Sequence, residues 1–160
     1  DNGHFHPTEQ VGDKISSILL FIDEILLHLT RGVRWDSDHV VTFNDDLLLI
    51  AQEIIRGKFL SRVNIGLDFF DASLNRIGAY VIGTRSAQMA FMFAMLEPYQ
   101  TLLKFEEKGR TFERLSFMEL MKTKPFGAVW DYYCLKENVP VGQDYIDEIV
   151  KYETEVLTKR

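Results

Sequence analysis

Apolar positions recur at helical spacing in two segments near the start of the chain. The first runs from about residue 12 to residue 23, where apolar side chains three or four positions apart would share one face. The second is "FNDDLLLIAQEIIRG", residues 43–57. Asn44 or Asp45 suits its N-terminal cap, and Gly57 suits a left-handed residue at its C-terminal end. We expect both segments to be helices.

Two short apolar runs alternate with these helices. The run "ILLHLTR", residues 25–31, could continue the first helix, but a leucine-rich run bounded by Gly32 also suits a buried parallel strand. The run "RVNIGLDFF", residues 62–70, predicts another short strand. Strands that alternate with helices are typical of parallel α/β folds, so the front half of the chain is predicted to be α/β.

Helical patterns dominate from about residue 72 onward. Asp71 is expected to cap the first of these helices, with "DASLNR" as its start. Interruptions are expected near "GTRS", residues 83–86, and at Gly109, Pro125 and Pro140. The expected helices cover residues 73–83, 86–107, 111–122, 126–137 and 143–157. The back half is therefore predicted to be a helical appendix to the α/β part.

Two or three predicted strands are too few for a complete parallel sheet. Such a sheet needs cover on both faces and neighbouring strands on both sides. The chain also begins within a stretch rich in potential metal-ligand side chains, "DNGHFHP". We therefore expect the chain to be a fragment of a larger barrel or sheet.

The composition is that of a globular protein and limits the partners to be considered. Hydrophobic residues make up 46% of the chain and charged residues 26%. Its apolar runs are shorter than the roughly 20 residues that a membrane span needs. The net charge of −6 argues against nucleic acid, which requires a clustered basic face, and suits a protein that holds cations. The single cysteine, Cys134, excludes an internal disulfide and fits a reducing cytosol.

The stretch "RWDSDHVV", residues 34–41, places two carboxylates close together. In an extended segment Asp36 and Asp38 would point the same way and repel, which would push one of them toward protonation. A divalent ion would turn this repulsion into coordination. The alternative is a solvated turn, because Asp and Ser are good turn residues. Trp35 is either a core residue or the wall of a pocket.

The stretch "DNGHFHP" carries a second group of potential metal ligands. Asp1 and His4 flank Gly3, which permits a sharp bend, and His4 and His6 have strand spacing. Imidazole and carboxylate groups at this density are suitable ligands for a metal ion. The alternative is a loop whose histidines cap backbone groups.

His28 and Asp68 complete the candidate ligands. His28 stands alone among leucines, which is typical of a core histidine. Asp68 follows an apolar strand, at the end where α/β barrels place their active sites. Three separate strand ends thus present Asp or His, and these side chains would converge if the strands are parallel neighbours.

These residues lie within long blocks that closely resemble the C-terminal portion of bacterial L-rhamnose isomerase. The blocks are "DNGHFHPTE", "DKIS", "LLHLTRGVRWDSDHVV" and "VNIGLDFFDASLNRIGAYVIGTR", and the similarity continues through "LLEPYQTL" and "AVWDYYC". The resemblance covers the whole chain. It implies the C-terminal part of a (β/α)8 TIM barrel, with the last barrel strands and helices in residues 1–84 and a helical region in residues 85–160.

The resemblance also implies an activity and its partners. Members of this family are cytoplasmic homotetramers that interconvert L-rhamnose and L-rhamnulose. They use manganese, with zinc, cobalt or magnesium as alternatives at one site. The reaction implied is a metal-assisted hydride shift between C2 and C1 of the sugar. The rest of the barrel would lie upstream of this chain, and the isolated segment is expected to be inactive.

Roles for individual residues follow from the same resemblance. It makes His4, Asp36 and Asp38 the ligands of the catalytic ion. It makes Asp1, His28 and Asp68 ligands of a second ion, beside a glutamate from an upstream strand. Asp68 is also expected to accept and return the hydroxyl proton, directly or through a water molecule. Trp35, Phe69 and Phe70 could shield the site, and Trp35 and Phe70 are expected to line the substrate pocket. No role is assigned to His6 and His39.

Two further hypotheses remain open at this point. The parent enzyme could be a related sugar isomerase of different specificity, because many sugar-selecting side chains would lie upstream. The isolated segment could instead be a non-catalytic module that binds a cation or serves oligomerisation.

Overall fold

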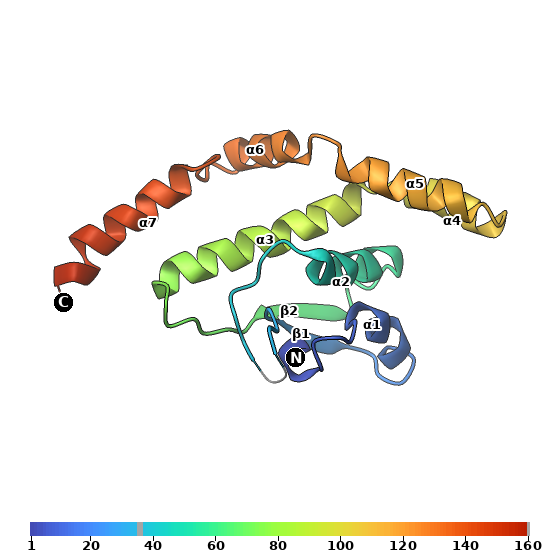
Figure 1. The fold of residues 1–160 in the computed structure, drawn as a ribbon, viewed down its shortest axis with the longest axis horizontal. Coiled ribbons are helices and arrows are strands. Elements are labelled where there is room, and N and C mark those ends of the chain that lie inside the picture. The colour runs from blue at the N-terminus through green and yellow to red at the C-terminus, as the bar shows by residue number, and fades with distance from the viewer. Residues whose placement is uncertain (35–36, 160) are drawn as a thin grey trace.

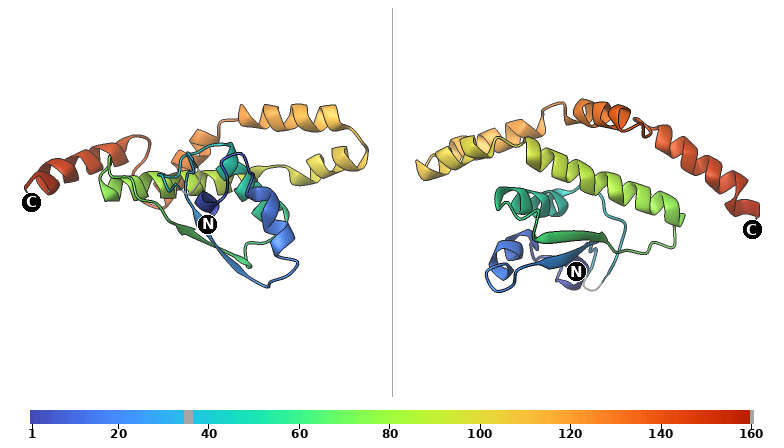
Figure 2. Two further views of the ribbon diagram at one scale, coloured as in Figure 1. Left: turned by 60° about the horizontal axis from the view of Figure 1, so that its bottom comes forward. Right: turned by 180° about the vertical axis from the view of Figure 1, so that it is seen from behind.

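The structure is a computed structural model that describes residues 1–34 and 37–159. Two of the predicted site residues, Trp35 and Asp36, lie outside the described residues. The front of the chain forms a small α/β unit, and the back helices form an arc that follows helix α3 on its side away from the sheet (Figures 1 and 2).

A two-stranded parallel sheet forms the base of the described part of the chain. Strand β1 (Ile25–Leu29) pairs with β2 (Val63–Leu67), and Ile25 lies opposite Val63. The strand interpretation of "ILLHLTR" is therefore confirmed. Leu27 and Leu29 are buried, whereas Leu26, whose side chain points to the opposite face, is 62% exposed, so the helices cover only one face of the sheet. The fold is α/β, mostly helical, with this small parallel sheet.

Helix α1 (Gly12–Ile18) ends five residues before the predicted residue 23. Arg62, just before β2, explains the early end. Its guanidinium donates hydrogen bonds to the backbone carbonyls of Leu19, Ile22 and Asp23, at distances of 2.7 to 2.8 Å. These carbonyls therefore have a tertiary partner that replaces the next helical turn.

Helix α2 (Asp45–Arg56) connects the two strands and begins as predicted. The side chain of Asn44 accepts a hydrogen bond from the backbone N–H of Leu47 at 3.0 Å. The expectation of a left-handed Gly57 is wrong, because its φ is −76° and Lys58 takes the positive φ of 60°. Gly57 is instead needed for space, since a Cβ atom there would overlap the ring of Phe59.

Helix α3 (Arg76–Leu96) is continuous, so the predicted interruption near "GTRS" is wrong. Gly83 within this stretch is buried and leaves room for the ring of Phe69, whose Cζ would lie 2.7 Å from a Cβ atom. The predicted boundary between residues 84 and 85 thus falls inside α3. Its N-terminal cap is Asn75 and not Asp71, as Asn75 Oδ1 accepts from the N–H of Gly78 at 2.6 Å.

The prediction of a single helix over residues 86–107 is wrong, because α3 ends at Leu96 and a new helix begins after Pro98. The helices after this break agree closely with the predicted pattern. They are α4 (Tyr99–Glu107), α5 (Thr111–Lys122), α6 (Phe126–Lys136), α7 (Asp144–Glu155) and the short 3₁₀ helix η2 (Leu157–Lys159). Helix α4 packs against α5, while α6 and α7 contact α3. Gly109, in the turn between α4 and α5, has the positive φ that glycine tolerates. Within the described ranges, no helix is both long enough and apolar enough to cross a membrane.

A buried ion pair fastens α2 to the end of α3. Glu97, directly after α3, is 8% exposed. Its carboxylate accepts two hydrogen bonds from Arg56, both at 2.7 Å, and one from Gln52 at 2.9 Å. This pair joins the helix behind the sheet to the helix that leads into the back half.

Candidate metal centre

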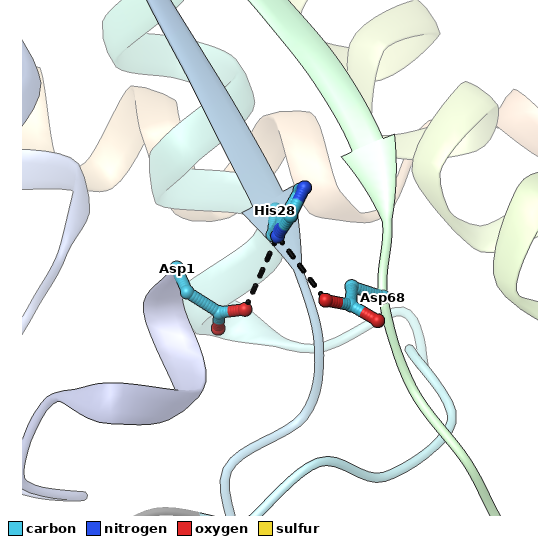
Figure 3. A group of neighbouring side chains, drawn as sticks. All are labelled: Asp1, His28 and Asp68. Carbon is cyan, nitrogen blue, oxygen red and sulfur yellow. Dashed lines mark ion pairs between the residues drawn. The ribbon is translucent and has the colours of Figure 1, made fainter.

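Three side chains meet at the C-terminal edge of the sheet. His28 is the fourth residue of β1, Asp68 directly follows β2, and Asp1 is the N-terminal cap of the 3₁₀ helix η1 (Asn2–His4). Figure 3 shows both carboxylates directed at the imidazole. His28 Nδ1 lies 3.4 Å from Asp1 Oδ2 and 3.2 Å from Asp68 Oδ2. One potential ligand atom from each residue lies within 4.8 Å of the others.

The backbone around these residues explains why they converge. The parallel register places His28 opposite Gly66, where a Cβ atom would lie 3.0 Å from His28 Cδ2. The backbone N–H of Asp68 donates to the carbonyl of Leu29 at 3.1 Å, which continues the ladder past the end of β2. Asp68 is thereby held beside the end of β1.

The two carboxylates differ in their surroundings. Asp1 is 10% exposed in its side chain, and its Oδ1 accepts a hydrogen bond from the N–H of Gly3 at 2.7 Å, so Oδ2 is the atom that faces His28. The side chain of Asp68 is 60% exposed. Asp68 is therefore the member of the group that a molecule arriving from solvent would contact first.

The donor set and its spacing suit a divalent cation. Ligand atoms about 2.1 Å from a common ion lie about 3.0 to 3.4 Å apart at octahedral or tetrahedral angles. The distances from His28 Nδ1 to both carboxylates fall near this range. An imidazole with two carboxylates is a donor set that manganese and zinc accept. A protonated His28 between the same carboxylates would have similar geometry without a metal.

The predicted set His4, Asp36 and Asp38 is described only in part, since Asp36 lies outside the described residues. The carboxylate of Asp38 lies against η1, the turn that contains His4. A Cβ atom on the buried Gly3 would clash with Asp38 Oδ1 and with Thr30 Cγ2. Glycine at position 3 is therefore required for this close approach, and a shared ion remains a prediction.

Sequence reasoning missed one residue of this region, Asn2. Its side-chain amide forms two hydrogen bonds with the backbone of Thr30, 28 positions later. The signal in the sequence was only its place between the candidate ligands Asp1 and His4.

His39 and Asp71 lie near each other. His39 Nδ1 is 4.0 Å from Asp71 Oδ2, and the His39 backbone bridges to Arg31. Hydrogen bonds from the hydroxyl and then the N–H of Ser73 lower the pKa of Asp71, and they outweigh the opposing effect of burial. The charges of His39 and Arg31 lower this pKa by smaller amounts. Asp71 thus stabilises the turn before α3. His6 contacts the hydroxyl of Thr8 at 2.7 Å.

The two aromatic residues after Asp68 point in different directions. Phe69 is buried, stacks on Tyr80 with ring centroids 4.9 Å apart and contacts Gly83, so it belongs to the core and is not a shield for the centre. Phe70 is 73% exposed. Its predicted place in a substrate pocket remains a prediction, as does that of Trp35.

Comparison with known proteins places the chain in one family. The model of the L-rhamnose isomerase (RhaA) family matches residues 1–160. The chain is 53% identical over 160 residues to L-rhamnose isomerase of Rhodopirellula baltica, and 56% and 51% identical to those of Bacteroides thetaiotaomicron and Pectobacterium atrosepticum. In each case the match covers 100% of this chain and 38% of the relative. The chain belongs to the L-rhamnose isomerase family.

Proposed function

We propose that this chain is part of a longer enzyme that interconverts L-rhamnose and L-rhamnulose. The observation that carries the proposal is the convergence of Asp1, His28 and Asp68, three potential metal ligands from separate segments, in a chain of this family. The relatives that bear the name L-rhamnose isomerase are longer, and the chain spans about 38% of their length. The substrate is therefore assigned to the longer protein.

The architecture proposed for the whole is a (β/α)8 barrel. Residues 1–84 would supply its last strands and helices, and residues 85–160 the helical region. The uncovered face of the sheet supports this arrangement, because Leu26 on that face is 62% exposed where side chains of further barrel strands would pack. We also propose that the whole protein is cytoplasmic and forms a homotetramer. The exposed apolar side chains of the back helices suit subunit interfaces; they include Phe112, Leu115, Leu135 and Val150.

Two divalent ions, manganese in the first instance, complete the proposed site. His4, Asp36 and Asp38 would hold one ion, and Asp1, His28 and Asp68 the other. A bound divalent ion supplies a Lewis acid that polarises the sugar carbonyl and lowers the pKa of the neighbouring hydroxyl.

The side chains of this chain have separate tasks in the proposed reaction. A hydrogen moves between C2 and C1 of the sugar with its electron pair, while a proton moves between O2 and O1. Asp68 accepts the proton from one oxygen and returns it to the other, a role that its exposed carboxylate supports. Asp1 and His28 orient the Asp68 carboxylate, and Trp35 and Phe70 line the substrate pocket.

The hydride shift makes a prediction about solvent hydrogen. Turnover of L-rhamnose by the full-length protein in heavy water should leave C1 of the product almost free of deuterium, because the migrating hydrogen never exchanges with solvent. Proton NMR of the ketose measures this directly. Substantial deuterium at C1 would mean that an enediol forms and would contradict the hydride shift.

The metal requirement is tested with the same full-length protein. After treatment with a chelator it should lose isomerase activity, and added manganese should restore it, measured as ketose formed from L-rhamnose. Residues 1–160 alone should be inactive under both conditions, because the upstream glutamate and sugar-binding residues are missing. Full activity in the metal-free protein would overturn the proposal, and faster turnover of another aldose would assign a different sugar.

A further inference from the structure

Asn2 joins η1 to the end of β1 through both ends of its side-chain amide. Asn2 Oδ1 accepts a hydrogen bond from the backbone N–H of Thr30 at 2.7 Å, and Asn2 Nδ2 donates to the backbone carbonyl of Thr30 at 2.9 Å. A neighbouring strand satisfies the two backbone groups of one residue in the same manner. The paired bonds fix the orientation of the turn as well as its distance from the strand.

The turn that carries Asn2 is short. Helix η1 is three residues long, and the bond from the N–H of Gly3 to Asp1 is local. Asp1 directly precedes Asn2, and His4 lies two positions after it. Asn2 therefore stands between a proposed ligand of each ion, and its two bonds place both ligands relative to β1.

Thr30 extends the same connection to the third ligand-bearing segment. It is 4% exposed, and its hydroxyl donates to the backbone carbonyl of His39 at 3.1 Å. His39 directly follows Asp38, whose carboxylate lies against Gly3. His28 lies two residues before Thr30, so in extended backbone both side chains point to the same face. One residue thus contacts η1 and the segment after Asp38 while it continues the strand that carries His28.

We propose that Asn2 is a positioning residue for both metal sites, which acts by clamping η1 to Thr30. The inference rests on the proposed function, in which the side chains around Asn2 bind divalent ions. Groups that orient metal ligands without touching the ion commonly change metal affinity or activity by about 10- to 100-fold when they are removed. Asn2 has no titratable proton, so its effect should be nearly independent of pH.

The test is the substitution Asn2→Ala in the full-length protein, with manganese binding measured by electron paramagnetic resonance of the free ion. We expect binding at both classes of site to weaken by about tenfold or more, because Asp1 and His4 lose their fixed positions together. The loss of activity should be large at limiting manganese and smaller at saturating manganese, where kcat should approach that of the unsubstituted protein. The matched control is Asn64→Ala, which removes an asparagine that donates to Glu24, 40 positions away, at the opposite end of the same sheet.

The possible outcomes separate the inference from the function on which it rests. If the unsubstituted protein binds no manganese, the proposed function fails first. If it binds manganese and Asn2→Ala binds as tightly, or if Asn64→Ala weakens binding equally, the positioning role is wrong. Should Asn2→Ala not fold, as judged by circular dichroism, Asn2→Ser decides by the same measurements. Failure of both variants to fold would assign Asn2 to stability alone and overturn the proposal.

Discussion

Replacing Asp68 by asparagine in the full-length protein is expected to lower kcat by about a hundredfold to ten-thousandfold, the usual contribution of general acid–base catalysis. Asparagine keeps the size of the side chain and an oxygen that can bind a metal, but it cannot accept the hydroxyl proton. Added manganese should therefore restore little of the lost activity. The measurement is kcat for L-rhamnose across a manganese titration.

Two neighbouring carboxylates provide controls for this experiment. Asp1→Asn removes the negative charge of the largely buried partner of His28, so activity should fall at limiting manganese and recover in excess manganese. Asp71→Asn changes the carboxylate three positions after Asp68. Asp71 forms a long ion pair with His39, at 4.0 Å, so this substitution should leave kcat nearly unchanged. Equal recovery of Asp68→Asn and Asp1→Asn in excess manganese would reduce Asp68 to a ligand and remove its role in proton transfer.

The convergence of His28 and Asp68 could be predicted because it depends mainly on the order of elements, whereas Asp1 caps the 3₁₀ helix η1 and does not lie at a strand end. Parallel strands bring their carboxyl ends to one edge, and residues there become neighbours even when the sequence separates them. His28 illustrates the limit of a local argument. Its leucine neighbours suggest a core histidine, and only the register with β2 places its imidazole at the edge beside Asp68.

Other features depended on contacts that no local pattern contains. Helix α1 stops early because Arg62 captures the carbonyls that follow it, and that arginine is about forty positions away. Helix α3 continues through Gly83 because the glycine admits the ring of Phe69 without breaking the helix. The clamp between Asn2 and Thr30 is of the same kind. In each case a side chain from another element decides what the backbone does.

Local chemistry was correctly interpreted where the interacting groups are adjacent in sequence. Asn44 caps α2, and the backbone N–H that donates to its side chain belongs to Leu47, only three positions later. The cap of α3 shows how such reasoning fails when several candidates are near. Asp71 is a good capping residue, but its carboxylate is already engaged by Ser73, and Asn75 caps the helix in its place.

The buried pair of Glu97 and Arg56 should make a large contribution to stability that one substitution can remove. Glu97→Gln leaves the Arg56 guanidinium, 19% exposed, without its countercharge in the interior. Breaking a buried ion pair by removing one partner typically costs about 3 kcal/mol or more, because the remaining charge is uncompensated. We expect the thermal midpoint of the full-length protein to fall by several degrees, as measured by differential scanning calorimetry.

The matched control is Glu113→Gln, which removes the same type of partner from Arg110 at 2.8 Å, where the two side chains are 39% and 50% exposed. Solvent screens that surface pair, so its loss should not change the midpoint measurably. Equal shifts for the two variants would show that burial adds nothing to the Glu97 pair.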